Sequence, residues 1–233
     1  MEFVAIGTVR TGSVDRLQGR VSSDSRPGCL HTRNRPIKET AVEFKDSQSA
    51  LNLLKAFAGE SQARNRYAFA AGIARKEGLE HVAAIFEETA DNEKEHAKLF
   101  YKQLAGLAPG ALEIAAVYPV VSGDTAAQLQ AAVDGENEEW TSLYPEFARI
   151  AREEGFPEVA KTFEWVSKVE KEHEARFKRL LDHVVNGTVF QRGEKIYWRC
   201  RNCGHIHEGT MAPKLCPVCL HTQAFFEPVA ERF

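Results

Sequence analysis

The chain has 233 residues, a formal net charge of -3, and 43% hydrophobic against 27% charged side chains. This composition is typical of a globular protein with one large or two smaller domains. The charge lacks the basic excess that nucleic-acid binding requires, and no apolar run in the sequence is long enough to predict a membrane span. We therefore expect neither nucleic acid nor a membrane as a partner.

Residues 1–45 show no helical or alternating apolar period and are scattered with Ser, Gly, Pro and Arg. We predict a mobile N-terminal extension. Its basic residues weakly resemble an organellar transit peptide, although Glu2, Asp15 and Asp24 interrupt the acid-poor pattern of such peptides. Organellar targeting by this extension stays open as an alternative to the cytoplasm.

Four amphipathic helices are predicted in the centre of the chain. Apolar residues recur at spacings of three and four over residues 47–78, 79–104, 124–155 and 157–187. This is the period of helices with one buried face. Gly78, Gly155 and Gly187 end three of the helices, and Asp124 can cap the third at its start. The segment 46–187 is therefore predicted to form a four-helix bundle.

The sequence Glu-x-x-His occurs twice, at Glu93–His96 and 77 positions later at Glu170–His173. Residues three apart on a helix are neighbours on its surface, so each copy presents a carboxylate and an imidazole together. Both copies, with Glu60 and Glu136 on the other helices, lie on stripes that are otherwise apolar. Burying such carboxylates unpaired is strongly unfavourable, so we predict bound cations. A solvated charged helix face would explain one copy alone, but not two.

The ligand pattern favours a pair of metal ions. One Glu from each of two helices and one Glu-x-x-His from each of the other two is the arrangement of di-iron carboxylate bundles. Oxygen and imidazole ligands suit iron or manganese. Shared carboxylates can bridge two ions, so we expect a dinuclear centre.

The two halves of the bundle differ by one inserted residue. Glu60 and Glu136 are 76 positions apart, whereas Tyr67 and Tyr144 are 77 apart. A single insertion in a helix is accommodated as a π-bulge, and such bulges gather at functional sites. We predict a π-bulge between residues 136 and 144 that presents Glu139 as a further ligand. The alternative is misalignment between diverged halves.

Four of the five cysteines form two Cys-x-x-Cys pairs, Cys200/Cys203 and Cys216/Cys219. Four thiolates at this spacing form a tetrahedral site for zinc or iron, and the pattern does not choose between them. The small apolar complement of residues 188–233 indicates a module that needs its metal to fold. Metal-binding thiols indicate a reducing compartment, here the cytoplasm. Cys29 has no neighbouring cysteine and is interpreted as incidental.

Four stretches of this chain closely resemble rubrerythrin: Phe57–Tyr67 (FAGESQARNRY), Glu88–His96 (ETADNEKEH), Tyr144–Gly155 (YPEFARIAREEG) and Trp198–Gly204 (WRCRNCG). The resemblance covers residues 46–233 and leaves the N-terminal extension unmatched. It implies an all-α, ferritin-like four-helix bundle with two non-haem irons over residues 46–187. A small, β-rich, rubredoxin-like iron domain is implied over residues 188–233.

The resemblance also implies roles for single residues. All the ligand positions of the family's di-iron centre are present, namely Glu60, Glu93, His96, Glu136, Glu139, Glu170 and His173. In the family one iron exchanges a carboxylate for a histidine on reduction, and the matching positions are Glu139 and His96. Tyr67 and Tyr144 match tyrosines beside the centre, although on sequence grounds they are equally well ordinary core aromatics. Cys200, Cys203, Cys216 and Cys219 match the ligands of the rubredoxin-type iron.

The activity implied by the resemblance is a peroxidase that reduces hydrogen peroxide to water in oxidative-stress defence. Electrons would come from the four-cysteine iron, recharged by an external rubredoxin or NAD(P)H-dependent reductase. A homodimer or higher homo-oligomer with head-to-tail subunits is also implied. Two alternatives stay open: a ferritin-like iron-oxidising protein with a structural zinc ribbon, and a non-enzymatic electron carrier.

Overall fold

The computed structural model describes residues 42–229. Most of the predicted N-terminal extension, residues 1–41 with Cys29, lies outside the described part of the chain. Of the extension's last residues, Phe44 begins a short 3-10 helix, Phe44–Asp46, and its ring packs edge-on against Phe156 with centroids 5.1 Å apart.

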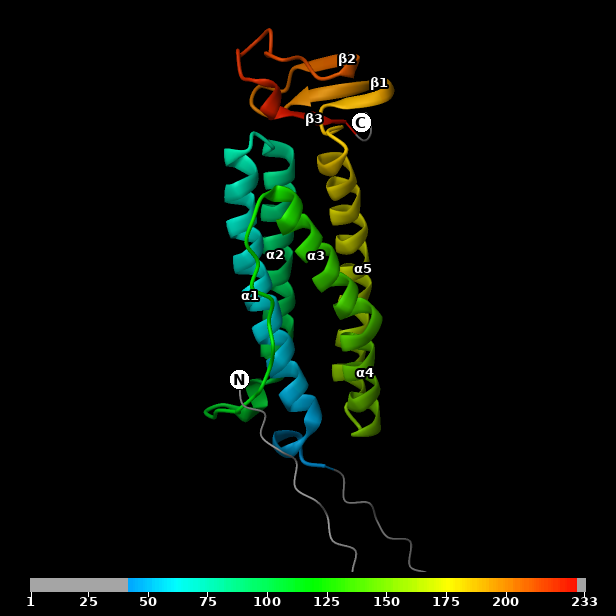
Figure 1. Cartoon of the computed structure of the whole chain (residues 1–233). Coiled ribbons are helices and arrows are strands. Elements are labelled where there is room, and N and C mark those ends of the chain that lie inside the picture. Colours follow the sequence, from blue (N-terminus) through cyan, green and yellow to red (C-terminus); the bar gives the residue numbers. More distant parts are fainter. Residues whose placement is uncertain (1–41, 230–233) are drawn as a thin grey trace, which may run out of the picture. The chain divides into compact units, whose positions relative to one another are not determined.

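Within residues 42–229 the chain forms five α-helices and three β-strands (Figure 1). The helices are α1 (Gln48–Lys76), α2 (Glu80–Gln103), α3 (Thr125–Glu138), α4 (Tyr144–Glu153) and α5 (Pro157–Val185). A π-helical segment, Glu139–Leu143, joins α3 to α4, so these three pieces form one continuous rod of the bundle. The four predicted helical segments are therefore confirmed.

The helix boundaries follow from local chemistry. Ser47 accepts a hydrogen bond from the Ala50 backbone N–H at the start of α1, and Asp124 does the same for Ala127 at the start of α3. Such side chains satisfy amide groups that have no partner inside the helix. Gly78 and Gly155 follow α1 and α4 with φ of +76° and +86°, a left-handed conformation that glycine adopts without strain.

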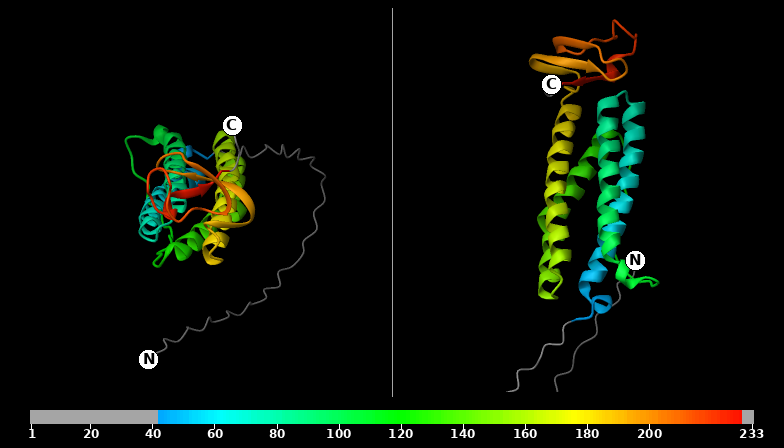
Figure 2. Two further views of the ribbon diagram at one scale, coloured as in Figure 1. Left: turned by 90° about the horizontal axis from the view of Figure 1, so that it is seen from above. Right: turned by 180° about the vertical axis from the view of Figure 1, so that it is seen from behind.

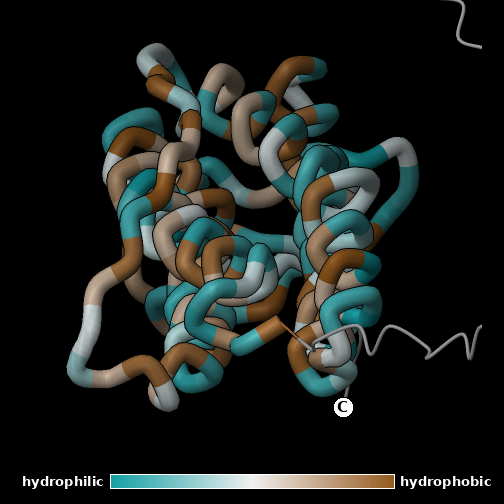
Figure 3. The backbone as a smooth tube through the Cα atoms, turned by 90° about the horizontal axis from the view of Figure 1, so that it is seen from below, coloured by the Kyte–Doolittle hydropathy of each residue, from teal (hydrophilic) through white to brown (hydrophobic). Residues whose placement is uncertain are grey.

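The helices pair as two antiparallel hairpins, α1 with α2 and the α3–α4 rod with α5 (Figure 2). Apolar and polar residues alternate in short bands along each helix, as the 3.6-residue period requires (Figure 3). None of the helices in the described residues is both long enough and apolar enough to cross a membrane.

Two aromatic clusters fill the bundle core, one on each side of a layer of buried carboxylates. Tyr67, Phe86 and Phe177 pack in the first, with ring centroids 5.1–6.0 Å apart. The second contains the residues at the matching repeat positions, Tyr144, Phe163 and Phe100, at 5.1–5.8 Å. The duplicated sequence thus gives a core with approximate two-fold symmetry.

The C-terminal module is a small antiparallel sheet with strand order β2-β1-β3, formed by β1 (Gln191–Cys200), β2 (Ile206–Met211) and β3 (Phe226–Pro228). Trp198 is fully buried at its centre and donates from Nε1 to the Gly209 carbonyl at 3.0 Å. Its apolar core is small and includes two of the four cysteines, Cys200 and Cys216. Metal binding therefore contributes directly to the stability of this module.

Candidate di-metal centre

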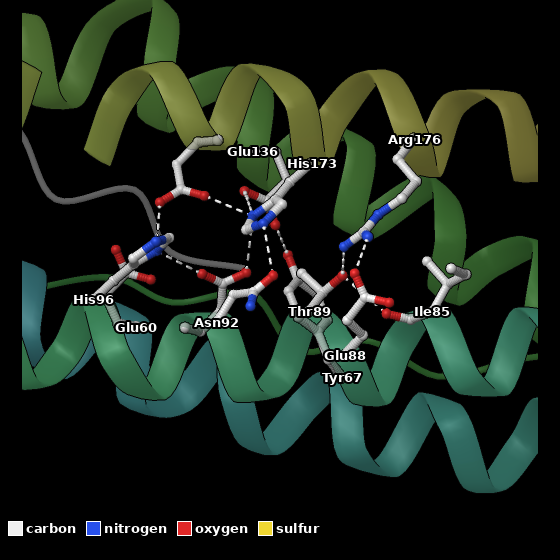
Figure 4. Close-up of polar contacts among 12 residues, drawn as sticks. Glu60, Tyr67, Ile85, Glu88, Thr89, Asn92, His96, Glu136, His173 and Arg176 are labelled. Atoms are coloured by element: carbon white, nitrogen blue, oxygen red, sulfur yellow. Dashed lines mark hydrogen bonds and ion pairs between the residues drawn. The ribbon is translucent and has the colours of Figure 1, made fainter. Parts of the chain in front are cut away.

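Four glutamates from four different helices meet in the layer between the aromatic clusters. Glu60 lies on α1, Glu93 on α2, Glu136 on α3 and Glu170 on α5, and each is at most 1% exposed. Figure 4 labels Glu60 and Glu136 of this layer, together with His96 and His173, between the helices. The helical period that placed them on apolar stripes also places them at one depth in the bundle.

Within the described part of the chain, these glutamates and two histidines form two overlapping groups. The first is Glu60, Glu93, His96 and Glu170, and the second is Glu136, Glu93, Glu170 and His173. In each group the potential ligand atoms lie within 4.8 Å of one another. Glu93 and Glu170 belong to both groups, which is the arrangement needed for two ions bridged by shared carboxylates. The sequence repeat relates each residue of the first group to a residue of the second.

The polar atoms of this layer fit cations better than they fit one another. His96 Nδ1 lies 2.9 Å from both a Glu93 and a Glu170 oxygen, yet it has no hydrogen-bond partner among the described residues. Neither approach has the directionality of a hydrogen bond. Both oxygens of Glu93 and of Glu170 have no hydrogen-bond partner among the described residues. Such buried orphan groups are costly, and two divalent ions would satisfy them together.

The electrostatics of the metal-free centre give the same result. Burial, followed by repulsion from neighbouring carboxylates, raises the pKa of Glu60 and Glu136 well above the ordinary value. Burial also works against charge on the two histidines, but the adjacent carboxylates of Glu170 and Glu93 outweigh it. They raise the pKa of His96 to about 10 and that of His173 to about 9. Without metal, the site therefore holds protons in place of cations.

The predicted π-bulge is confirmed. Residues Glu139–Leu143 are π-helical, and the Tyr144 N–H bonds to the Glu139 carbonyl five residues earlier. Side-chain hydroxyls cover carbonyls in this region: Thr141 Oγ1 donates to the Asn137 carbonyl and Ser142 Oγ to the Glu138 carbonyl. The inserted residue is therefore absorbed in a helix whose polar groups have local partners.

Glu139 lies in this π-helical segment and is partly buried. Its carboxylate is outside both groups of four, but its charge is the strongest neighbouring influence on the pKa of Glu60. Arg66 and His96 are the cationic groups that act on Glu139. Glu139 thus lies beside the first group of ligand-type residues, Glu60, Glu93, His96 and Glu170, which we call the Glu60–His96 position. Its role as a ligand stays a prediction.

Tyr67 and Tyr144 connect the two hairpins through the carboxylate layer. Tyr67 donates its hydroxyl to Glu136 Oε1 at 2.5 Å, and Tyr144 donates to Glu60 Oε1. Each tyrosine bonds the glutamate of the opposite half, so the pair repeats the two-fold symmetry. Burial raises the pKa of both phenols well above 10, which keeps them protonated as donors.

Sequence reasoning missed Asn92. Its Oδ1 lies 3.3 Å from Nε2 of His173, across the interface between α2 and α5 (Figure 4). A carbonyl oxygen at this nitrogen favours the tautomer in which Nδ1 is free to bind a metal. The matching repeat position is Val169, which has no such group. That difference between the repeats is visible in the sequence and could have indicated the role.

A cavity of about 650 Å3 adjoins the centre on the side of Glu139. Gly59 and Gly135, which precede the ligand-type residues Glu60 and Glu136, both line it, and Tyr118 from the crossover lies over it. A side chain at Gly59 would meet the Tyr118 ring at 3.8 Å. The paired glycines thus keep the helix surfaces open next to the buried carboxylates.

The four cysteines also converge. Their sulfurs lie within 4.8 Å of one another, with Cys200–Cys219 at 3.7 Å and Cys203–Cys216 at 3.6 Å. These separations are far longer than a disulfide bond and suit a tetrahedral thiolate site. A hydrogen bond from the His221 backbone N–H is the largest cause that lowers the pKa of Cys219, to about 6, which favours its thiolate.

A four-helix bundle with this carboxylate–histidine layer, followed by a four-cysteine sheet module, defines a ferritin-like di-iron protein with a rubredoxin-like domain. The family model of rubrerythrin matches residues 52–181, and that of the rubrerythrin rubredoxin-like domain matches residues 198–227. The chain therefore belongs to the rubrerythrin family. It carries the family's two kinds of metal site, a di-iron carboxylate–histidine site and a four-cysteine site for iron or zinc.

Individual relatives agree with this assignment. The chain is 55% identical to rubrerythrin of Porphyromonas gingivalis over 84% of this chain and 96% of that protein. It is 50% identical to rubrerythrin of Nitratidesulfovibrio vulgaris, over 79% and 95% respectively. A solved structure of nigerythrin in a mixed-valence state superposes with a TM-score of 0.54 at 28% identity, covering 83% of this chain and 90% of that one.

Proposed function

We propose that this chain is a non-haem di-iron peroxidase that reduces hydrogen peroxide to water. The observation that carries the proposal is the pair of adjacent, buried metal positions that share Glu93 and Glu170. Reduction of one peroxide to two waters consumes two electrons and two protons. Two ferrous ions held side by side would supply both electrons in one encounter, without releasing a one-electron product.

The protein's own groups would hold this chemistry in place. Glu60, Glu93, His96, Glu136, Glu139, Glu170 and His173 are the proposed ligands, and the buried aromatic clusters on both sides exclude bulk water. Tyr67 and Tyr144 would fix the orientation of Glu136 and Glu60 through their hydroxyl bonds. Because the phenols stay protonated, they are also hydrogen-bond donors next to the site of reduction.

The cavity beside Glu139 is the proposed entry for peroxide. Its lining includes Gly59 and Gly135, next to Glu60 and Glu136 in the sequence, and Glu139 of the π-helical segment. Hydrogen peroxide is small and polar, and the charged groups of Arg66 and Glu139 line this route. This placement would bring substrate to the Glu60–His96 position first.

The four-cysteine site is the proposed electron relay, held by Cys200, Cys203, Cys216 and Cys219. Cys203 is exposed, so an external rubredoxin or NAD(P)H-dependent reductase could approach the site closely. We further propose domain boundaries at residues 46–187 and 188–233, a homodimer or higher homo-oligomer, and a reducing compartment such as the cytoplasm.

The test is stopped-flow reaction of the natively purified, metal-analysed and fully reduced protein with peroxide and, separately, with oxygen. Peroxide is expected to reoxidise the protein rapidly, at two electrons per peroxide. Glu93→Ala should abolish this reaction because it removes a shared ligand. Glu95→Ala is the matched control, since Glu95 lies in the same motif but is exposed and paired with Lys98.

A different outcome would favour the iron-oxidising alternative. Zinc in the four-cysteine site, no reaction with peroxide and rapid reaction of added Fe(II) with oxygen would contradict the peroxidase proposal. Ferric iron held by four thiolates is red, whereas zinc is colourless, so the metal analysis has an immediate visible check.

A further inference from the structure

The direction of the Glu139 side chain depends on where the π-bulge lies. The second half has one residue more between Glu136 and Tyr144 than the first half has between Glu60 and Tyr67. In an α-helix each residue turns the side-chain direction by about 100°. The π-helical segment begins at Glu139, so Glu139 keeps its α-helical register with Glu136. If the bulge moved toward Glu136 and the extra residue fell before Glu139, the Glu139 side chain would rotate away from the metal centre. The bulge therefore needs contacts that fix its position.

Glu174 on α5 supplies two of these contacts. Its Oε2 accepts a hydrogen bond from Trp140 Nε1 at 2.7 Å, and its Oε1 lies 3.3 Å from the amide nitrogen of Asn137. Glu174 is only 8% exposed and directly follows His173. One buried carboxylate is thus bonded to residues on both sides of Glu139.

Further contacts from the same face of α5 hold Trp140. Ser167 Oγ donates to the Trp140 carbonyl at 3.3 Å, and the Lys171 ammonium lies 5.2 Å from the centre of the indole ring. Ser167, Lys171 and Glu174 are spaced by four and three residues, so they lie on one face of the helix. The backbone carbonyl, the ring and the side-chain N–H of Trp140 each have a partner on this face of α5.

The other end of the bulge is fixed by different means. Pro145 lies in the first turn of α4 and has no backbone N–H to donate. A proline is tolerated at the start of regular helix but not in its interior. Tyr144 is anchored by its hydroxyl bond to Glu60. The irregular turns are thereby confined to the residues before Tyr144.

We propose that Asn137, Trp140, Ser167 and Glu174 form a clamp that fixes the π-bulge and aims Glu139 at the Glu60–His96 metal position. These four are positioning residues, because they act through Glu139. The inference rests on the proposed role of Glu139 as a ligand, but not on the identity of the oxidant. It explains why the inserted stretch contains a tryptophan whose N–H is bonded to a buried carboxylate.

The experiment is an anaerobic calorimetric titration of the full-length protein with Fe(II), after a chelator has emptied the di-metal centre. Trp140→Phe keeps an aromatic ring but loses the N–H donor, and should weaken binding of one of the two ions by about 10–100-fold. Glu174→Ala should do the same, whereas Glu174→Gln, whose amide oxygen still accepts from Trp140, should largely restore binding. Trp165→Phe is the matched control, because Trp165 is 59% exposed.

The decisive arm is the double variant. If the clamp acts through Glu139, Trp140→Phe should cause no further loss when Glu139 is already changed to Gln. Additive losses, or wild-type binding in either Trp140→Phe or Glu139→Gln, would overturn the proposal. Peroxide turnover of the wild-type protein is scored separately, so failure of the peroxidase proposal is distinguishable from failure of the clamp.

Discussion

The two metal sites of this chain are each built from a repeated motif, but the symmetry of the repeat is kept in one site and broken in the other. In the four-cysteine module both Cys-x-x-Cys loops make the same backbone bonds, Gly204 N–H to the Cys200 carbonyl and Leu220 N–H to the Cys216 carbonyl. The residue after each loop has positive φ, +78° at Gly204 and +63° at Leu220. The module keeps its local two-fold symmetry even where leucine replaces glycine.

In the bundle the same kind of symmetry is present in the core and broken at the edge of the centre. The aromatic clusters, shared glutamates and tyrosine bonds exchange under the repeat. Among the described residues, a π-helical segment with Glu139 is present in the second half of the bundle and not in the first. The position that corresponds to Asn92 in the second half is occupied by Val169.

The difference is consistent with the two proposed tasks. A centre that only passes one electron needs rigid and equivalent ligands. A centre that receives a substrate on one side needs one position open to change and one held in place. Glu139 lines the cavity and is the neighbouring charge with the largest effect on the pKa of Glu60, whereas Asn92 Oδ1 lies 3.3 Å from Nε2 of His173, the histidine of the other group.

The largest expected effect comes from removing metal from the bundle. In the folded metal-free protein Glu60 and Glu136 have raised pKa values, and the pKa values of His96 and His173 are raised to about 10 and 9. These groups therefore hold their protons more tightly in the folded than in the unfolded chain. Groups with raised folded pKa values stabilise fully below the unfolded pKa and lose that stabilisation as pH rises through the folded value. The melting temperature of the metal-free protein should therefore fall as pH rises from about 4.5, where the glutamates begin to lose their contribution, and through the histidine range from about 6.5 to about 10.

The metal-loaded protein is the control for this prediction. With cations bound, the carboxylates are charged and the imidazoles neutral over the whole range, so its melting temperature should change far less. Parallel calorimetric scans of the two forms measure the difference, and identical pH profiles would contradict a metal site in this layer.

Asn92→Val copies the residue of the opposite repeat and should make His173 resemble His96. Loss of the oxygen that fixes the His173 ring should weaken the binding of one of the two ions by about 10–100-fold. Equilibrium dialysis against Fe(II) measures this affinity. Asn92→Asp retains the acceptor and should bind nearly as the wild type. Unchanged binding by Asn92→Val would show that this contact does not distinguish the halves.

Tyr67→Phe and Tyr144→Phe test the part of the bundle that is symmetric. Each removes a hydrogen bond to a buried carboxylate, and each should lower the free energy of unfolding of the metal-free protein by about 1–3 kcal/mol. Urea unfolding measures both, with Tyr101→Phe, exposed at 60%, as the control. Clearly unequal losses would place the asymmetry deeper in the core than we infer.

The smallest expected effect is on the stability of the four-cysteine module. Leu220→Gly relieves a left-handed leucine, a conformation that costs roughly 1–2 kcal/mol, and the gain is reduced by the entropy of glycine. We expect net stabilisation of up to about 1 kcal/mol. Gly204→Ala at the matching position should destabilise by a similar amount. Unfolding monitored by loss of metal absorption checks both, and a destabilised Leu220→Gly would mean that the leucine side chain matters more than its backbone.

Much of this organisation could be predicted from the sequence because it depends on local period and spacing. The helices, the inward glutamates and the bulge follow from the positions of Glu60, Glu93 and the offset at Tyr144. The partners of Asn92 and Trp140 could not be predicted in the same way. Their contacts join helices far apart in the sequence, and both side chains read locally as ordinary polar or aromatic surface residues.

The unequal metal positions are tested most directly by Mössbauer spectroscopy of the fully reduced protein, loaded with isotopically enriched iron. Apart from the four-thiolate iron, we predict two ferrous doublets of equal area and different quadrupole splitting, because Glu139 and Asn92 act on different metal positions. A single doublet of twice the area would contradict this prediction, since the two ions would then have equivalent surroundings.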